Sequence, residues 1–250
     1  MAEVPWLVRP RVRPDARVRL VCLPFAGGGT NVYRSWLPLL PPGVELCLAQ
    51  LPGREVRFNE PALTRMAPVV EALAEALRPL GELPVVLFGH SVGALVAFEL
   101  ARRLEADGAV ELKHLVASGR AAPSVKERAP MHTLPDGAFR DAIKRLGGTP
   151  DEVLANDELM RLVLPVLRAD LAVDETHAVA PGTTVRCPLL VLGDTADALT
   201  PPGTLEAWRD HASGPFRVVT VEGGHFFVLH NRQAVLRELD GVLRPWVEAR

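Results

Sequence analysis

Six short apolar runs, rich in leucine and β-branched residues, recur along the chain. They span Val18–Leu23, Val44–Leu48, Val85–Phe88, Leu112–Ala117, Leu189–Leu192 and Phe216–Val221. Near-continuous apolar runs of this kind predict strands that are covered on both faces, unlike the alternating pattern of a half-exposed sheet. We therefore expect a mostly parallel central sheet.

Segments with helical spacing lie between these runs. Met66–Leu80 carries apolar residues on one side and charged residues on the other, which predicts an amphipathic helix. Ser91–Glu105 is nearly apolar through its first two turns, which predicts a buried helix. Thr204–His211 and Ala234–Val247 continue the alternation of strands and helices. The pattern predicts an α/β fold with helices flanking the sheet.

The alternation breaks between residues 120 and 182, where the sequence predicts no strand. Three stretches there look helical: Asp136–Leu146, Asp151–Val153 and Asp157–Val179. An insertion between two strands of an open α/β sheet lies near the strand ends, where ligand sites are built. We expect one domain, residues 1–250, with this helical insertion as a lid.

Composition excludes several classes of protein. The chain has 250 residues, 48% of them hydrophobic, and a formal net charge of −2, values typical of a soluble globular domain and not of a nucleic-acid binder. The three cysteines are odd in number and form no CxxC pair, which argues against a disulfide framework and a zinc site. The amino terminus lacks the apolar core of a signal peptide, so we expect a cytoplasmic protein without a membrane segment.

The sequence Gly89-His90-Ser91-Val92-Gly93 matches G-x-S-x-G, the pattern of a nucleophilic serine on a sharp strand-to-helix turn. Its context supports this interpretation, because a predicted strand precedes it and a predicted helix follows it directly. The glycines fit the turn, since it holds the serine in strained geometry and leaves no room for neighbouring side chains. The alternative, a serine that merely caps a helix, does not require the preceding strand.

A serine hydroxyl needs a base, and the base needs an orienting acid. His225 follows the last predicted strand and completes the chain order Ser, Asp, His of an α/β hydrolase. His90 lies in the turn, so we expect it to pack or hydrogen-bond beneath the site. Two aspartates compete for the role of the acid. We favour Asp197, farther along the loop, whereas Asp194 abuts the strand end and could cap the turn.

Acyl transfer also needs backbone N–H donors for the oxyanion. We expect one from Val92, the residue after the nucleophile, and one from Ala26 in the glycine-rich loop after the first predicted strand. Asp170, Asp174 and His177 share one helix face and could in principle bind a metal, but a solvated or lid-packing face explains them better. We expect no metal.

With these residues in place, the sequence resembles the type II thioesterases that accompany modular polyketide synthases and nonribosomal peptide synthetases. The residues that carry the resemblance span most of the chain: Leu23 to Gly29, Tyr33 and Trp36, Gln50 to Glu55, Arg57, Glu60-Pro61, Gly89-His90-Ser91, Leu167 to Asp170, and Gly223 to Phe226. The family's acid lies on a loop before a helix that bears a tryptophan, and Asp197 followed by Trp208 is similar to that arrangement. Val92 and His177 differ from the methionine and tyrosine common at those positions, and the loop Gly193–Asp197 is one residue longer.

The resemblance implies an α/β-hydrolase fold and hydrolysis of acyl groups from the phosphopantetheine arm of acyl or peptidyl carrier proteins, which clears stalled units. No cofactor of its own is implied, because the phosphopantetheine belongs to the partner. The lid would form a largely apolar chamber. Its candidate residues are Met131, Leu134, Phe139, Leu159 and Leu162, and Phe25 and Phe226 are further candidates for binding the substrate.

Two other functions remain open from the sequence. One is an esterase for small esters, or an acyltransferase that uses another acceptor than water. The other is a carrier-protein binding module without catalysis, against which the complete set of candidate Ser, His and Asp residues argues. A monomer is the default expectation for the oligomeric state.

Overall fold

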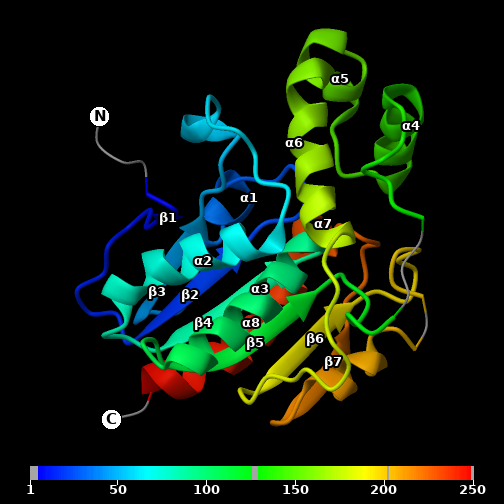
Figure 1. Ribbon diagram of the computed structural model, residues 1–250. Helices are drawn as coiled ribbons and strands as arrows, with labels where there is room; N and C mark the ends of the chain where they lie inside the picture. Colours follow the sequence, from blue (N-terminus) through cyan, green and yellow to red (C-terminus); the bar gives the residue numbers. More distant parts are fainter. Residues whose placement is uncertain (1–4, 126–128, 202, 249–250) are drawn as a thin grey trace.

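The computed structural model describes residues 5–125, 129–201 and 203–248, and its centre is a seven-stranded sheet (Figure 1). The strands are β1 (Leu7–Val8), β2 (Val18–Leu23), β3 (Val44–Ala49), β4 (Val85–His90), β5 (Leu112–Ser118), β6 (Leu189–Gly193) and β7 (Phe216–Thr220). Their spatial order is β1-β3-β2-β4-β5-β6-β7, and only β1 runs antiparallel to its neighbour. The predicted α/β fold with a mostly parallel sheet is confirmed. The sequence did not predict β1, because two residues carry no periodic signal.

Helices cover both faces of the sheet. They are α1 (Asn31–Arg34), α2 (Met66–Leu77), α3 (Val92–Asp107), α4 (Asp136–Leu146), α5 (Asp151–Leu154), α6 (Asp157–Glu175), α7 (Phe227–His230) and α8 (Arg232–Glu248). Short 3-10 turns are η1 (Leu37–Leu39), η2 (Glu55–Arg57), η3 (Arg78–Leu80) and η4 (Glu206–His211). Helices α2 and α3 pack on one face, and α8 packs on the other, as Figure 1 shows.

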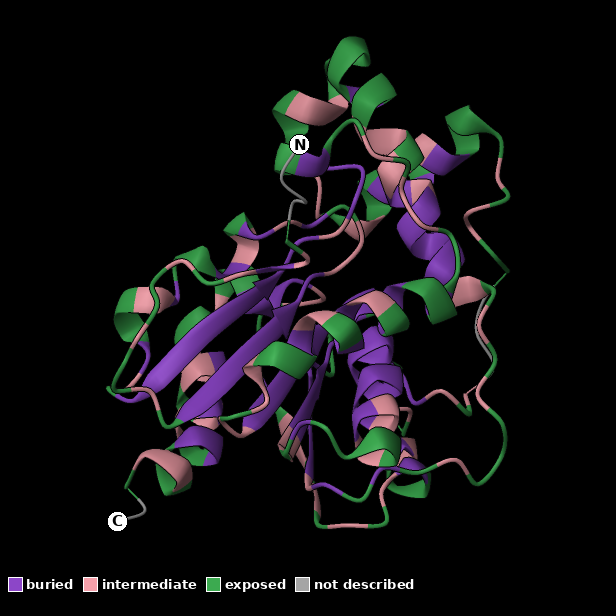
Figure 2. Ribbon diagram, turned by 60° about the vertical axis from the view of Figure 1, so that its left-hand side comes forward, coloured by how far each residue is buried: buried purple, intermediate pink, exposed green. Residues whose placement is uncertain are grey.

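The two-sided cover explains the continuous apolar runs. In β4, Val85 and Leu87 belong to the core beneath α2 and α3, whereas Val86 and Phe88 belong to the core beneath α8. Successive side chains of a strand point to opposite faces, so both sets must be apolar when both faces are covered. All of β4 is buried, and the central strands in Figure 2 are accordingly coloured as buried.

Helices α4, α5 and α6 lie between β5 and β6, in the region expected to be a helical insertion. The carboxyl half of α6 lies near α3, while α5 and the start of α6 project away from the sheet (Figure 1). Helix α6 begins at a capped end, because Asn156 Oδ1 accepts the N–H groups of Glu158 and Leu159 at 2.9 and 3.1 Å. It ends at Glu175, four residues before the predicted end.

One predicted helix is of a different type. The segment expected to be helical at Thr204–His211 forms the 3-10 turn η4, with bonds such as Trp208 N–H to Leu205 O. Trp208 is fully buried, and its Nε1 donates to Arg120 O at 2.9 Å. The contact joins the loop after β6 to the chain just after β5, so side chains from both loops are held at the same edge of the sheet.

Two findings bear on the class of protein. In the part of the chain that the structure describes, no helix is long and apolar enough to cross a membrane. Cys22, Cys47 and Cys187 are buried free thiols, which agrees with the absence of a disulfide framework in the sequence interpretation.

Backbone atoms of neighbouring segments lie very close to one another at the turn from β4 to α3. A Cβ atom on Gly89 would lie 2.0 Å from Gly93 O, and one on Gly93 would lie 2.4 Å from Leu23 O. Real Cβ atoms do not approach backbone oxygens so closely, because their van der Waals surfaces would overlap. Glycine at these positions lets β4, α3 and the end of β2 close upon one another around residue 91.

Gly89→Ala is expected to lower the free energy of unfolding by about 2 kcal/mol or more, because neither neighbouring backbone segment can give way cheaply. The matched control is Gly241→Ala in α8, where a new Cβ meets nothing within 4 Å and helix propensity improves by roughly 0.5–1 kcal/mol. Urea unfolding followed by circular dichroism measures both. Equal stability of the two variants would contradict this account of the turn.

Candidate active site

Ser91 occupies the turn in an unusual backbone conformation. Its φ and ψ are 56° and −123°, and among the described residues only Glu55 shares a positive φ without being glycine. The Ser91 N–H donates to Ser118 O of β5 at 2.8 Å, which ties the turn to the neighbouring strand. Such strain persists only where the surrounding structure enforces it. It holds the Ser91 side chain at the wall of a cavity.

Ser91, His225 and Asp197 form a chain of hydrogen-bonding groups. His225 Nε2 lies 3.2 Å from Ser91 Oγ, and His225 Nδ1 lies 2.8 Å from Asp197 Oδ2. A carboxylate only accepts, so Nδ1 carries the proton and Nε2 is left to accept the serine O–H. Asp197 is 3% exposed, and its other oxygen accepts the Leu199 N–H at 2.8 Å. This arrangement gives the serine a base and fixes the tautomer of that base.

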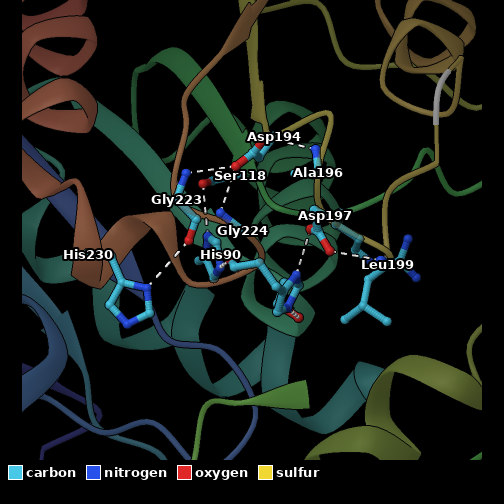
Figure 3. A network of polar contacts seen from close by, with 12 residues as sticks. His90, Ser118, Asp194, Ala196, Asp197, Leu199, Gly223, Gly224 and His230 are labelled. Atoms are coloured by element: carbon cyan, nitrogen blue, oxygen red, sulfur yellow. Dashed lines mark hydrogen bonds and ion pairs between the residues drawn. The ribbon is translucent and has the colours of Figure 1, made fainter. Parts of the chain in front are cut away.

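Asp194, the competing aspartate, bonds elsewhere (Figure 3). Its Oδ2 accepts the N–H groups of Gly223 and Gly224 at 2.7 and 2.6 Å, and its Oδ1 accepts the Ala196 N–H at 2.9 Å. These backbone donors, the Ala196 N–H foremost, lower the pKa of the Asp194 carboxyl below its ordinary value of 3.8. Asp194 therefore joins the loop after β6 to the loop that carries the histidine.

His90 lies beneath the site and is hydrogen-bonded to two of its neighbours. Its Nε2 lies 2.9 Å from the His225 carbonyl oxygen, so this nitrogen carries the proton, and Nδ1 accepts from Ser118 Oγ at 2.9 Å. Complete burial holds the pKa of His90 well below its ordinary value of 6.5, and the nearby His225 lowers it further. The ring is neutral and supports the backbone of His225, as the sequence led us to expect.

The two candidate oxyanion donors flank Ser91. Ala26 and Val92 both line the cavity together with Ser91. Within the described residues, no protein acceptor is bonded to the backbone N–H of either one. The N–H of Val92 is free because it opens α3, whose first turn leaves donors without intrahelical partners. Two unsatisfied donors beside a serine hydroxyl are suited to bind a developing negative charge.

A largely apolar cavity of about 230 Å³ opens beside Ser91 beneath the helical insertion. Of the predicted chamber and substrate-binding residues, Phe25, Met131 and Phe226 line it. Further walls come from Ile143 and Leu146 of α4, and from Leu167 and Leu171 of α6. Sequence reasoning missed these four. Asp170 lies between the two leucines of α6, in the motif Leu167 to Asp170 that carries part of the resemblance. That motif could have indicated which face of α6 points towards the cavity.

The other four predicted chamber residues do not line the cavity. Leu159 and Leu162 lie on the projecting part of α6 and are 41% and 51% exposed. Phe139 is fully buried, but it packs within the insertion, where the Arg168 guanidinium lies 4.3 Å from its ring centre. Leu134 packs against the core instead of facing the cavity. Helical spacing identified apolar positions, but which face of each helix meets the cavity depends on how the insertion is tilted.

The polar face of α6 binds other protein groups. Asp170 pairs with Arg54, and Asp174 pairs with Arg120 at 2.9 Å. His177, expected on the same helix face, lies two residues beyond the end of α6, and its Nε2 lies 3.1 Å from Glu99 Oε1. Among the described residues, no cluster of His, Cys, Asp and Glu is arranged to hold a metal ion. The carboxylates of this face serve to pack the helix.

The fold and the Ser91 turn define an α/β hydrolase. A family model described as a thioesterase domain matches residues 18–243, and the chain belongs to that thioesterase family. A protein of Streptomyces griseus described as a "probable cadicidin biosynthesis thioesterase" is 40% identical over 240 residues, which are 96% of this chain and 66% of that protein. The gramicidin S biosynthesis protein GrsT of Aneurinibacillus migulanus is 37% identical, over 96% of each chain.

A solved structure is also similar. The type II thioesterase BorB from the borrelidin biosynthetic cluster superposes with a TM-score of 0.86 at 37% identity, and covers 95% of this chain and 97% of its own. The resemblance expected from the sequence motifs is confirmed at the level of family and fold.

Replacing each of the two aspartates with asparagine distinguishes the catalytic role expected for Asp197 from the structural role expected for Asp194. Asp197→Asn is expected to lower kcat for a p-nitrophenyl ester by about 10³–10⁴-fold with little change in stability, because the amide cannot fix the same histidine tautomer. Asp194→Asn is expected to cost about 1–3 kcal/mol of stability, because an NH₂ group would face backbone donors. It should keep most of the kcat. A larger kcat loss in Asp194→Asn would show that the roles are reversed.

His90 is expected to make stability depend on pH. Its pKa is lowered in the folded state, so below about pH 6.5 the unfolded chain takes up a proton that the folded chain does not. The free energy of unfolding should fall by up to roughly 1.4 kcal/mol per pH unit as the pH drops from 6.5 towards 5.

The variant His90→Gln, which keeps a donor for the His225 carbonyl, should lose this slope in urea unfolding across the same pH range. His114, whose pKa burial lowers to about 4, contributes equally to both proteins and cancels in the comparison. Identical slopes would mean that His90 is not the titrating group.

Proposed function

We propose that this protein is a serine thioesterase that hydrolyses acyl groups from the phosphopantetheine thiol of acyl or peptidyl carrier proteins. Its role would be to clear stalled or misloaded units from a polyketide synthase or nonribosomal peptide synthetase. The observation that carries the proposal is the Ser91–His225–Asp197 chain at the mouth of an apolar cavity. Membership of the thioesterase family and the biosynthetic relatives support the choice of substrate.

The first step is attack of Ser91 Oγ on the thioester carbonyl carbon. His225 Nε2 lies within reach of the hydroxyl proton and takes it as the bond forms. Asp197 holds the imidazole in the required tautomer and stabilises its positive charge. The carbonyl oxygen gains a negative charge in the tetrahedral intermediate, and the N–H groups of Ala26 and Val92 are the donors that would stabilise it.

Collapse of that intermediate breaks the carbon–sulfur bond. His225 gives its proton to the leaving thiolate, and the acyl group remains as an ester on Ser91. A water molecule then loses a proton to His225 and attacks the ester carbonyl, and the second collapse restores Ser91 and releases the free acid. This sequence needs no metal and no cofactor of the enzyme's own.

The cavity would hold the acyl group during both steps. Its walls of Leu167, Leu171, Ile143 and Phe226 are apolar and suit an alkyl or ketide chain. The carrier protein would approach from outside the insertion and pass its flexible arm to Ser91. We propose that the enzyme does this as a cytoplasmic monomer.

Ser91→Ala is expected to abolish the release of free thiol from acetyl- to hexanoyl-loaded carrier protein, with a loss of about 10⁴-fold or more in kcat. The matched control is Ser35→Ala, which removes an exposed hydroxyl outside the cavity and should keep full activity. Thiol release is followed with a chromogenic disulfide.

Activity on p-nitrophenyl esters without any thiol release from loaded carrier protein would overturn the proposed substrate and favour an esterase. Transfer of the acyl group to an added alcohol or amine in preference to water would favour an acyltransferase. Carrier binding by a wild type that turns over neither substrate would favour a binding module.

A further inference from the structure

The loop after β2, which carries Ala26, is held by side chains from two distant parts of the chain. Asp170 of α6 accepts the Gly27 N–H at 2.7 Å. Arg54, from the loop after β3, donates to Gly28 O at 3.0 Å. The peptide groups Ala26–Gly27 and Gly28–Gly29 are thus bonded to charged side chains. Hydrogen bonds to ionised groups are shorter and about twice as strong as neutral ones.

Arg54 and Asp170 also bind each other. Nη1 and Nη2 of Arg54 lie 2.7 Å from Oδ2 and Oδ1 of Asp170, so the pair is bidentate. The two residues are 7% and 6% exposed. A planar fork that meets a carboxylate edge to edge leaves little freedom to either group. Asp170 Oδ2 therefore presents a fixed acceptor to the Gly27 N–H.

The far end of the same loop is held by the next residue of the sequence. Glu55 Oε1 accepts from Thr30 Oγ1 at 3.1 Å and from the Asn31 N–H at 3.3 Å. Glu55 adopts a φ of 48°, one of two strained non-glycine positions among the described residues, and Ser91 is the other. Strain of this kind costs about 1–3 kcal/mol and persists when surrounding contacts impose it. The Arg54-Glu55 pair thus holds the loop at two points.

Ala26 lies inside the turn that these contacts fix. The Gly28 N–H donates to Phe25 O at 2.9 Å, and Gly27 has a φ of +75°, so Ala26 and Gly27 are the central residues of a tight turn. A Cβ on Gly27 would lie 2.6 Å from Leu167 Cδ2, which shows how closely α6 packs on this turn. The direction of the Ala26 N–H depends on the orientation of its neighbours.

We propose that Asp170, held by Arg54, is a positioning residue that aims the Ala26 N–H at the oxyanion, so that helix α6 of the insertion sets the geometry of the oxyanion site. The inference rests on the proposed function, in which Ala26 is an oxyanion donor. It gives the insertion a second role besides enclosing the acyl group. When α6 is seated, the oxyanion site is assembled, and displacement of α6 would release the Gly27 peptide.

The test compares Asp170→Asn with Glu45→Gln. Glu45 is the matched control because it forms a buried pair with Arg19 at 2.7 Å at the opposite end of the sheet, far from the Ser91 turn. Substrates are hexanoyl carrier protein and p-nitrophenyl hexanoate. Pentyl trifluoromethyl ketone is the probe for the oxyanion, because Ser91 adds to its carbonyl carbon and leaves a tetrahedral alkoxide. Hexanoate is the probe for ground-state binding.

We expect Asp170→Asn to lower kcat by about 10- to 100-fold, less than the complete removal of an oxyanion donor, with KM changed by less than about twofold. The inhibition constant of the ketone should rise by the same factor as kcat falls, and inhibition by hexanoate should not change. Glu45→Gln should keep its kcat and its ketone affinity within about twofold, even if it is less stable.

Arg54→Lys keeps the experiment decisive if Asp170→Asn does not fold. It retains the buried positive charge but cannot form the bidentate pair, so kcat and ketone affinity should fall together by a smaller factor. Equal losses in Glu45→Gln, or a ketone affinity that does not follow kcat, would overturn the inference and leave Asp170 as an anchor of α6 alone.

Failure of the inference is distinct from failure of the proposed function. If the wild type releases thiol from hexanoyl carrier protein and Asp170→Asn is unchanged, the proposed function stands and the positioning role is wrong. If the wild type cleaves only the p-nitrophenyl ester, the proposed substrate is wrong. The comparison of kcat with ketone affinity on that ester still tests Asp170.

Discussion

The close approach of backbone segments around residue 91 is the constraint on which the site depends. Ser91 can hold a positive φ only because Gly89 and Gly93 let β4, α3 and the end of β2 pack without intervening side chains. Backbone contact also fixes the N–H of Val92 at the first turn of α3. A side chain at either glycine would displace Ser91 and the Val92 N–H together.

Hydrogen bonds between loops that follow different strands hold the residues around Ser91 in place. Asp194 joins the loop after β6 to the backbone at Gly223 and Gly224, and His90 reaches from β4 to the carbonyl of His225. Asp194 and His90 are buried, and a buried donor or acceptor without a partner is costly, so each of these side chains keeps its bonds. The carbonyl of His225 is thus bonded to His90, the two residues before His225 are bonded to Asp194, and its ring is bonded to Asp197.

The helical insertion is bound to this framework by charge and by apolar contact. Leu167 and Asp170 lie one turn apart on α6 and meet the same loop: Leu167 occupies the space that a Cβ on Gly27 would need, and Asp170 accepts the Gly27 N–H. Leu159 and Leu162, nearer the start of the helix, project beyond the body and are exposed. The same helix thus has a part that packs on the loop after β2 and a part that projects away from the sheet.

The sequence alone determined six of the seven strands, the mostly parallel character of the sheet and the sharp turn at Ser91. These are local or periodic properties: continuous apolar runs report two-sided burial, and G-x-S-x-G between a strand and a helix reports a sharp turn. The sequence left Asp194 and Asp197 as alternatives and misjudged Leu134, Phe139, Leu159 and Leu162. Only the tertiary structure decided these points, because they depend on which loop atoms meet across the sheet edge and on the tilt of α6, and neither is encoded in local spacing.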